Sequence, residues 1–216
     1  GFSLASQDLD IRGAGNLLGE EQSGDIREVG YELYQSMLRR AIEKLKADGV
    51  NSDYEQESLS PQIDLNVPVL IPENYVTDLS VRLTLYRELA FLKSDDELDE
   101  FRERLRDRFG PVPREINTLI DVMSIKNACI LAGIDALKAG AIGLSLSFYE
   151  NKFSDPEGLM KFIESNKSKI KIKENKIIIS AIWDDDDSKM QVIKKVVKGL
   201  ATMVQKKTPS KEGASY

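Results

Sequence analysis

The spacing of apolar residues changes along the chain, and these changes divide it into parts. Between residues 25 and 47, apolar side chains recur every three or four positions, which predicts an amphipathic helix. Residues 48–60 are polar and show no such period, so they predict a linker and a domain boundary. A second set of periodic segments follows, and we expect it to form a separate domain over residues 61–204.

The first half of this second part is predicted to be mainly helical. Apolar and polar residues alternate over 63–67, which is typical of a half-buried strand. Three segments with a helical period then follow, at about 76–92, 95–109 and 113–132.

The last third has the shorter period of strands and turns. The expected elements are strands at 136–138 and 142–149, a helix at 156–166, a hairpin of strands 169–173 and 176–181 across Glu174-Asn175, a helix at 186–203, and a disordered tail at 205–216. The predicted fold class is therefore α+β. An N-terminal motif loop and helix precede a compact domain, which has a helical half and a small antiparallel sheet packed with helices.

Composition agrees with a soluble globular chain and narrows its chemistry. Of the 216 residues, 41% are apolar and 31% are charged, and the formal net charge is −6. A free-standing duplex-binding domain usually carries a basic stripe, so the chain as a whole does not resemble one, although a local basic patch is compatible with this balance.

Histidine is absent and Cys129 is the single cysteine. Zinc sites built from cysteine and histidine are thereby excluded, as is an internal disulfide. Cys129 lies in an apolar helical pattern, so we expect a buried thiol in a reducing, cytoplasmic environment. The N-terminus lacks the features of a signal peptide, and no apolar run is long enough to cross a membrane.

The glycine-rich segment 1–24 does not match a nucleotide-binding loop. The pattern GxxxxGK[ST] is absent, and the glycines at 13, 15 and 19 have the wrong spacing for a dinucleotide fingerprint. Acidic runs at 95–97 and 184–187 fit the first turns of helices better than a cation site, because negative charge there complements the helix dipole. We therefore expect no catalytic residue, metal or cofactor in this chain.

The segment Asp8–Gly24 contains parts suited to relaying a movement. Arg12 stands beside two glycines, and Gln22 precedes Ser-Gly. Arginine can bind a carboxylate or phosphate with two parallel hydrogen bonds, glutamine can both donate and accept, and glycines let a loop change shape.

This segment resembles the motif that follows the second RecA-like domain in RecG helicases and in the transcription-repair coupling factors (Mfd). In that family the motif couples ATP turnover to movement along double-stranded DNA. The family's key arginine and glutamine fall on Arg12 and Gln22, and a purely structural role for both is the alternative. The other motif positions carried over are Gly13, Gly15, Gly19, Glu20 and Glu21.

Later segments point to the coupling-factor branch of this family. The sequence SPQIDLNV at 60–67, with Pro72, Arg82-Leu83 and Tyr86, resembles the start of the C-terminal domain of coupling factors. The sequence Asp107-Arg-Phe-Gly110 with Pro113 is similar too, and the resemblance covers about residues 1–203. Residues 1–47 would then be the end of the second RecA-like translocase domain.

The resemblance implies a role for each part. The parent would be a bacterial ATP-dependent DNA translocase, holding ATP and magnesium elsewhere, that displaces stalled RNA polymerase and recruits nucleotide excision repair. The C-terminal domain would dock on the parent's own UvrB-like module and hide the surface that binds UvrA. On helix 95–109, Asp99, Glu103 and Asp107 are candidate docking residues, with an ordinary solvated face as the alternative.

Two other functions remain open. The lysines between Lys167 and Lys176 alternate with other residues, so they could form a nucleic-acid-binding face, or a solvated edge that guards against aggregation. An exposed strand edge could also dock a peptide.

Overall fold

A computed structural model describes residues 60–207 of the chain. The predicted helix at 25–47, almost all of the linker at 48–60 and the motif Asp8–Gly24 lie outside the described residues, and their assignments stay predictions. The described residues belong to two compact units. The first contains 68–92 and 96–120, and the second contains 60–67, 93–95 and 121–207.

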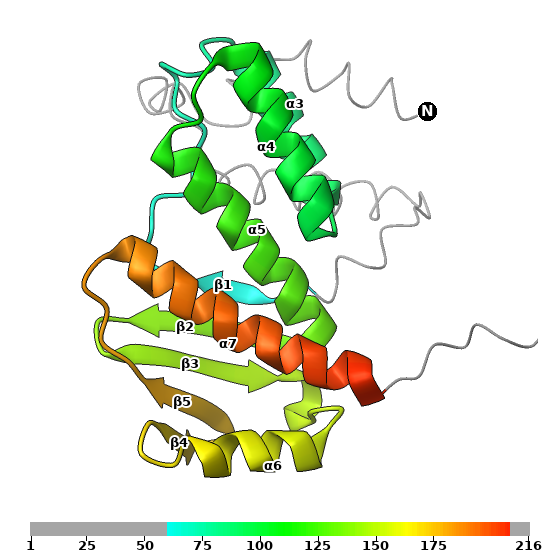
Figure 1. Cartoon of the computed structure of the whole chain (residues 1–216), viewed down its shortest axis with the longest axis vertical. Coiled ribbons are helices and arrows are strands. Elements are labelled where there is room, and N and C mark those ends of the chain that lie inside the picture. The colour runs from blue at the N-terminus through cyan, green and yellow to red at the C-terminus, as the bar shows by residue number, and fades with distance from the viewer. Residues whose placement is uncertain (1–59, 208–216) are drawn as a thin grey trace, which may run out of the picture. The chain divides into compact units, whose positions relative to one another are not determined.

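The first unit is built from helices. Helix α3 spans Leu79–Phe91, α4 spans Asp95–Phe109, and α5 spans Arg114–Ala132 and supplies residues to both units (Figure 1). The side chain of Asp78 caps α3 by accepting a hydrogen bond from the Val81 amide at 3.1 Å. All three predicted helices are confirmed. Each could be predicted because its apolar residues recur at helical spacing over several turns.

Buried polar side chains attach the segment before α3 to that helix. The Tyr86 hydroxyl accepts a hydrogen bond from the Ile71 amide at 2.7 Å, and burial raises the pKa of Tyr86 to about 12. Arg82 is 2% exposed, and its Nη1 donates to the carbonyls of Val76 at 2.6 Å and Thr77 at 3.1 Å. The positions that resemble the coupling-factor domain, Arg82 and Tyr86, therefore hold this part of the unit together.

Tyr86→Phe is expected to lower the free energy of unfolding by about 1–3 kcal/mol, because it leaves the buried Ile71 amide without its acceptor. Urea denaturation would measure this as a lower midpoint with an unchanged slope. Tyr149→Phe is the matched control, since the Tyr149 hydroxyl has no hydrogen bond to a described residue, and it should change little. Equal stability of Tyr86→Phe and the wild-type chain would contradict the assignment.

The second unit contains a five-stranded sheet in the order β1-β2-β3-β5-β4. Its strands are β1 (Gln62–Asp64), β2 (Ile134–Gly140), β3 (Gly143–Phe148), β4 (Ile170–Lys173) and β5 (Lys176–Ser180). The α+β class is confirmed, and β2 to β5 pair in the expected antiparallel sense. Because β1 pairs with β2 in parallel, the complete sheet is mixed.

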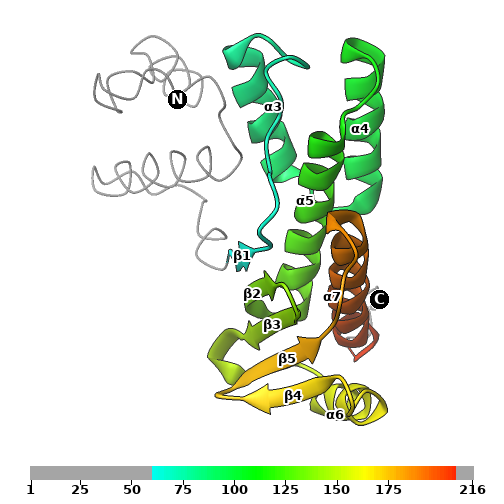
Figure 2. The same ribbon diagram turned by 90° about the vertical axis from the view of Figure 1, so that its left-hand side faces the viewer.

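Helices cover one face of this sheet. Helices α6 (Pro156–Ser165) and α7 (Asp186–Lys207) lie on the same side of it (Figures 1 and 2), and a short 3-10 turn at Tyr149–Asn151 follows β3. Alternate strand residues supply the buried side, including Leu144, Leu146, Ile177 and Ile179. Helix α7 continues to Lys207, four residues beyond its predicted end at 203.

The predicted buried cysteine is confirmed. Cys129 is fully buried in α5, and burial raises the pKa of its thiol to about 12. A thiol with so high a pKa stays protonated near neutral pH, so it packs as a small apolar group rather than acting as a nucleophile.

Candidate docking surface

Helix α4 is held in the first unit by one buried stripe. Leu98, Phe101 and Leu105 are each at most 2% exposed and recur at the three- and four-residue spacing of a helix. The Tyr75 hydroxyl donates to the carbonyl oxygens of Leu105 at 3.0 Å and Gly110 at 2.9 Å, which satisfies acceptors at the helix C-terminus. The opposite face of α4 is therefore exposed on a helix that is firmly packed into the first unit.

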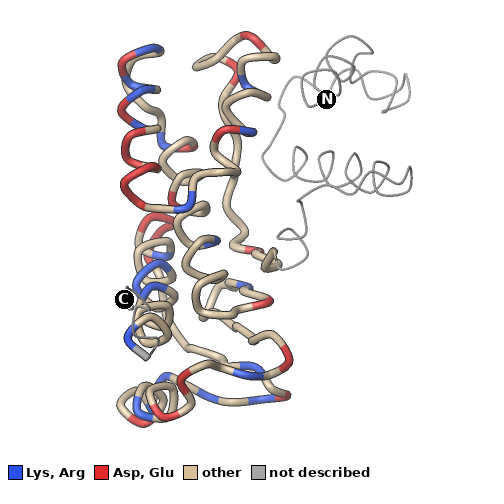
Figure 3. Tube along the Cα trace, turned by 90° about the vertical axis from the view of Figure 1, so that its right-hand side faces the viewer, with Lys and Arg blue, Asp and Glu red and all other residues tan. Residues whose placement is uncertain are grey.

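The three predicted docking residues share that opposite face. Asp99, Glu103 and Asp107 are all exposed and follow one another at four-residue intervals, so their carboxylates form one stripe. Figure 3 shows acidic and basic positions interleaved along this helix. The structure thus brings together the residues that the sequence proposed, on one continuous charged stripe.

Most of these charges already take part in surface ion pairs. Asp99 pairs with Arg102 and Glu103 pairs with Arg106, while Arg104 pairs with Glu88 of α3. Exposed pairs of this kind contribute about 0–1 kcal/mol each, so a partner's arginine or lysine could replace the internal one at little cost. Asp107 makes no ion pair with a described residue.

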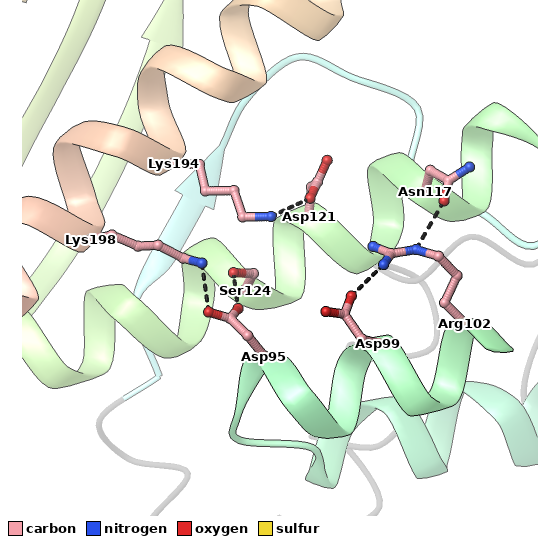
Figure 4. Close-up of polar contacts among 8 residues, drawn as sticks. All are labelled: Asp95, Asp99, Arg102, Asn117, Asp121, Ser124, Lys194 and Lys198. Atoms are coloured by element: carbon pink, nitrogen blue, oxygen red, sulfur yellow. Dashed lines mark hydrogen bonds and ion pairs between the residues drawn. The ribbon is translucent and has the colours of Figure 1, made fainter.

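Arg102 connects the stripe to the turn after the helix. Its Nε donates to Asn117 Oδ1 at 3.2 Å (Figure 4), and the Asn117 amide nitrogen donates to the carbonyls of Val112 at 3.4 Å and Pro113 at 3.2 Å. This contact limits the freedom of the Arg102 side chain, and with it the position of Asp99.

A second polar cluster, which the sequence did not predict, lies within the second unit. Lys198 donates to Asp95 Oδ2 and Ser124 donates to Asp95 Oδ1, each at 2.6 Å, while Lys194 pairs with Asp121 at 2.6 Å (Figure 4). Partial burial would raise the pKa of Asp95, but the hydrogen bonds from Lys198 and Ser124 and the nearby positive charges outweigh it and lower that pKa. The carboxylate is therefore charged near neutral pH, and the cluster attaches α7 to Asp95 and α5.

The sequence alone does not identify the partners in this cluster. The helix dipole accounts for an acidic residue such as Asp95 in the first turn of α4, and it indicates no distant partner for that residue. Lys198 is 103 positions away from Asp95, and Lys194 is 73 positions away from Asp121. Only the one-turn spacing of the two lysines on α7 hints that they act on a common surface.

Over residues 60–207, no three acidic or cysteine side chains gather where they could hold a metal ion. None of the helices in the same range is long and apolar enough to span a membrane.

Comparison with known proteins decides the family. A model of the TRCF domain matches residues 65–159, which include all of α4. The transcription-repair-coupling factor of Rickettsia typhi is 41% identical over 186 residues, covering 85% of this chain and 16% of that protein. The chain belongs to the transcription-repair coupling factor family. The Escherichia coli member is 36% identical over 164 residues, covering 76% of this chain and 14% of that protein.

A solved structure supports the fold. The crystal structure of the C-terminal domain of a transcription-repair coupling factor aligns with a TM-score of 0.54 at 11% identity, covering 70% of this chain and 98% of that one. The chain spans about one sixth of the length of the curated coupling factors it matches. It therefore corresponds to a fragment of these relatives that contains the TRCF domain.

Proposed function

We propose that this chain is the C-terminal part of an ATP-dependent translocase on double-stranded DNA, which displaces stalled RNA polymerase and recruits nucleotide excision repair in the bacterial cytoplasm. The family relationship supports this proposal, together with the motif at Asp8–Gly24. ATP and magnesium would bind in the motor of the parent, so the fragment alone would hydrolyse no ATP. A hydrolysis rate of the purified chain above that of a contaminant control would contradict this.

Residues 1–47 would end the second RecA-like domain and couple ATP turnover to movement. Arg12 and Gln22 would carry that coupling, with Gly13, Gly15 and Gly19 allowing the loop to move and Glu20 and Glu21 completing the motif.

The domain from residue 61 onward would act as an internal clamp. It would dock on the parent's own UvrB-like module and cover the surface that recruits UvrA until polymerase is engaged. The observation that carries this proposal is the stripe Asp99, Glu103 and Asp107, exposed on a helix that a buried stripe holds in place. A contact that must open is expected to be polar and of moderate size, as this stripe would provide.

The stripe can be tested by charge reversal in a binding assay. The chain carrying Asp99→Lys, Glu103→Lys and Asp107→Lys should bind the N-terminal half of the parent at least about tenfold more weakly than the wild-type chain. The estimate follows from three exposed pairs worth roughly 0.5 kcal/mol each, since about 1.4 kcal/mol is a tenfold change. Isothermal titration at physiological salt would measure it.

A matched reversal controls for net charge. Glu157→Lys, Glu164→Lys and Asp184→Lys change the same number of exposed carboxylates, all within the second unit, and should leave the affinity unchanged. In the parent, truncation after residue 59 should give the full release and raise UvrA binding. The clamp proposal would be rejected if the Asp99, Glu103 and Asp107 reversal bound the N-terminal half as tightly as the wild-type chain. It would also be rejected if truncation left UvrA binding unchanged.

A further inference from the structure

Positive charge is concentrated on the β4–β5 hairpin. Between Lys167 and Lys176 there are five lysines and a single carboxylate, Glu174, although the whole chain carries a net charge of −6. All five lysine side chains are exposed, and Figure 3 shows basic positions along both strands. Lys173 lies 3.9 Å from Glu174, and the other four form no ion pair with a residue in the range 60–207.

Strand register places these lysines on one face of the sheet. Lys173 stands opposite Lys176, and Lys171 stands opposite Ile178. The intervening Ile177 and Ile179 are buried on the other face, which is the side where α6 and α7 lie (Figure 2). Because side chains alternate along a strand, Lys171, Lys173 and Lys176 project from the opposite face, which no helix of the second unit covers.

The turn holds the like charges together. Glu174 and Asn175 have φ angles of 50° and 60°, the left-handed pair that a two-residue hairpin turn requires. Lys173 and Lys176 are therefore directly opposite each other, an arrangement in which like charges are destabilising. Protection of an edge strand accounts for the lysines of β4 but not for Lys176, because β5 is an inner strand of the sheet.

The rest of this face carries mainly small or polar side chains in the central strands. Ile178 pairs with Ser145 of β3, which in turn pairs with Lys138 of β2, and Ser147 lies opposite Ala136. Small side chains in the central strands leave room for a bulky ligand to approach. Lys138 adds a further exposed ammonium, although it lies 3.5 Å from Asp64.

The spacing of the lysines suits a phosphate backbone. Residues two positions apart on a strand are about 6.8 Å apart. A strand of duplex DNA carries one phosphate for about every 3.4 Å of helix axis, so a row of ammonium groups at this interval can contact several phosphates of one backbone. Lys169 precedes β4, continues the same alternation, and is joined to the sheet by its carbonyl, which accepts from the Ser180 amide at 2.7 Å.

We propose that Lys169, Lys171, Lys173 and Lys176, which we term the lysine face, bind the phosphate backbone of duplex DNA without reading its sequence. The lysine face uses none of the residues of the motif at Asp8–Gly24 or of the α4 stripe. It would give the C-terminal domain its own contact with the polymer on which a translocase works. The contact is electrostatic, so it should be weak and strongly dependent on salt.

The test is fluorescence anisotropy of a random-sequence 25-base-pair duplex titrated with the complete 216-residue chain. The wild-type chain should bind in low salt with an affinity of about 10 to 100 µM, weakening with a log–log salt slope near −3 to −4 for four phosphate contacts. Changing all four lysines to glutamate should weaken binding at least tenfold and remove most of that slope. No binding by the wild-type chain at 50 mM salt would overturn the proposal.

The glutamate variant also separates the two interpretations of the lysines. Charged side chains protect an edge strand from pairing with another chain, so the glutamate variant should stay monomeric in size-exclusion chromatography while losing its affinity for DNA. If it aggregates, the same four positions changed to glutamine supply the measurement. Retention of full affinity by the variant that remains folded would overturn the proposal.

A second variant controls for overall charge. Glutamate at Lys152, Lys161, Lys195 and Lys206 makes the same change in net charge at exposed positions outside the hairpin. This control should keep most of the affinity and the salt slope. Equal loss in both variants would show a general charge effect and overturn a local site.

Discussion

Arg12→Ala in the parent translocase is expected to abolish movement along DNA while leaving ATP hydrolysis within about twofold of the wild-type rate. A guanidinium can hold a carboxylate or phosphate with two parallel hydrogen bonds, and alanine removes both. A charge-assisted contact of this kind is worth about 1.5–3 kcal/mol, so the coupled step should slow by roughly 10- to 150-fold, which leaves little or no measurable movement. Displacement of a triplex-forming strand measures movement, and phosphate release measures hydrolysis.

Arg12→Lys is the informative control for this prediction. Lysine keeps the positive charge but cannot make two parallel hydrogen bonds from one planar group. Translocation should therefore remain impaired if that paired contact is what Arg12 supplies. Gln22→Ala should also reduce movement, because Gln22 is the second residue proposed to carry the coupling. Translocation at the wild-type rate in Arg12→Ala would end the relay proposal. Parallel loss of hydrolysis would instead place Arg12 in the nucleotide site.

The helices were predictable because their signals are local. Helix α4 begins and ends at the predicted residues, since Leu98, Phe101 and Leu105 mark its buried stripe and Gly110-Pro111 follows its end. The candidate docking stripe was found for the same reason. Three carboxylates at four-residue intervals must share a helix face, whatever the rest of the chain does.

Contacts between distant segments were not predictable. Nothing in the sequence of β1 selects β2 as its parallel neighbour, although the paired residues, such as Gln62 and Ala136, are 74 positions apart. The same holds for Tyr75, whose hydroxyl reaches carbonyls 30 and 35 positions away, and for the ion pair of Asp95 with Lys198. Alternation gives the face on which a strand residue lies, but the strand order that sets its neighbours comes from tertiary packing.

Phe101→Ala is expected to lower the free energy of unfolding by about 3–5 kcal/mol, the usual cost of removing a buried phenyl ring. Phe101 is 1% exposed in the stripe that holds α4, and the Arg104 guanidinium lies 5.7 Å from the centre of its ring. A loss of this size is a large share of the 5–15 kcal/mol typical of a folded domain. Denaturant unfolding followed by circular dichroism would measure it.

Phe91→Ala makes the same chemical change in α3 at a residue that is 60% exposed, and it should cost less than about 1 kcal/mol. Similar losses in the two variants would contradict the assigned burial.

Phe101→Ala also tests the docking proposal. Phe101→Ala should weaken binding to the N-terminal half of the parent by disturbing α4 while every carboxylate remains. The Asp99, Glu103 and Asp107 reversal should weaken it with the fold intact. Phe101→Ala alters the packing beneath α4, whereas the triple reversal alters only its charge. If both variants bind more weakly but only Phe101→Ala is less stable, the contact lies on α4 itself.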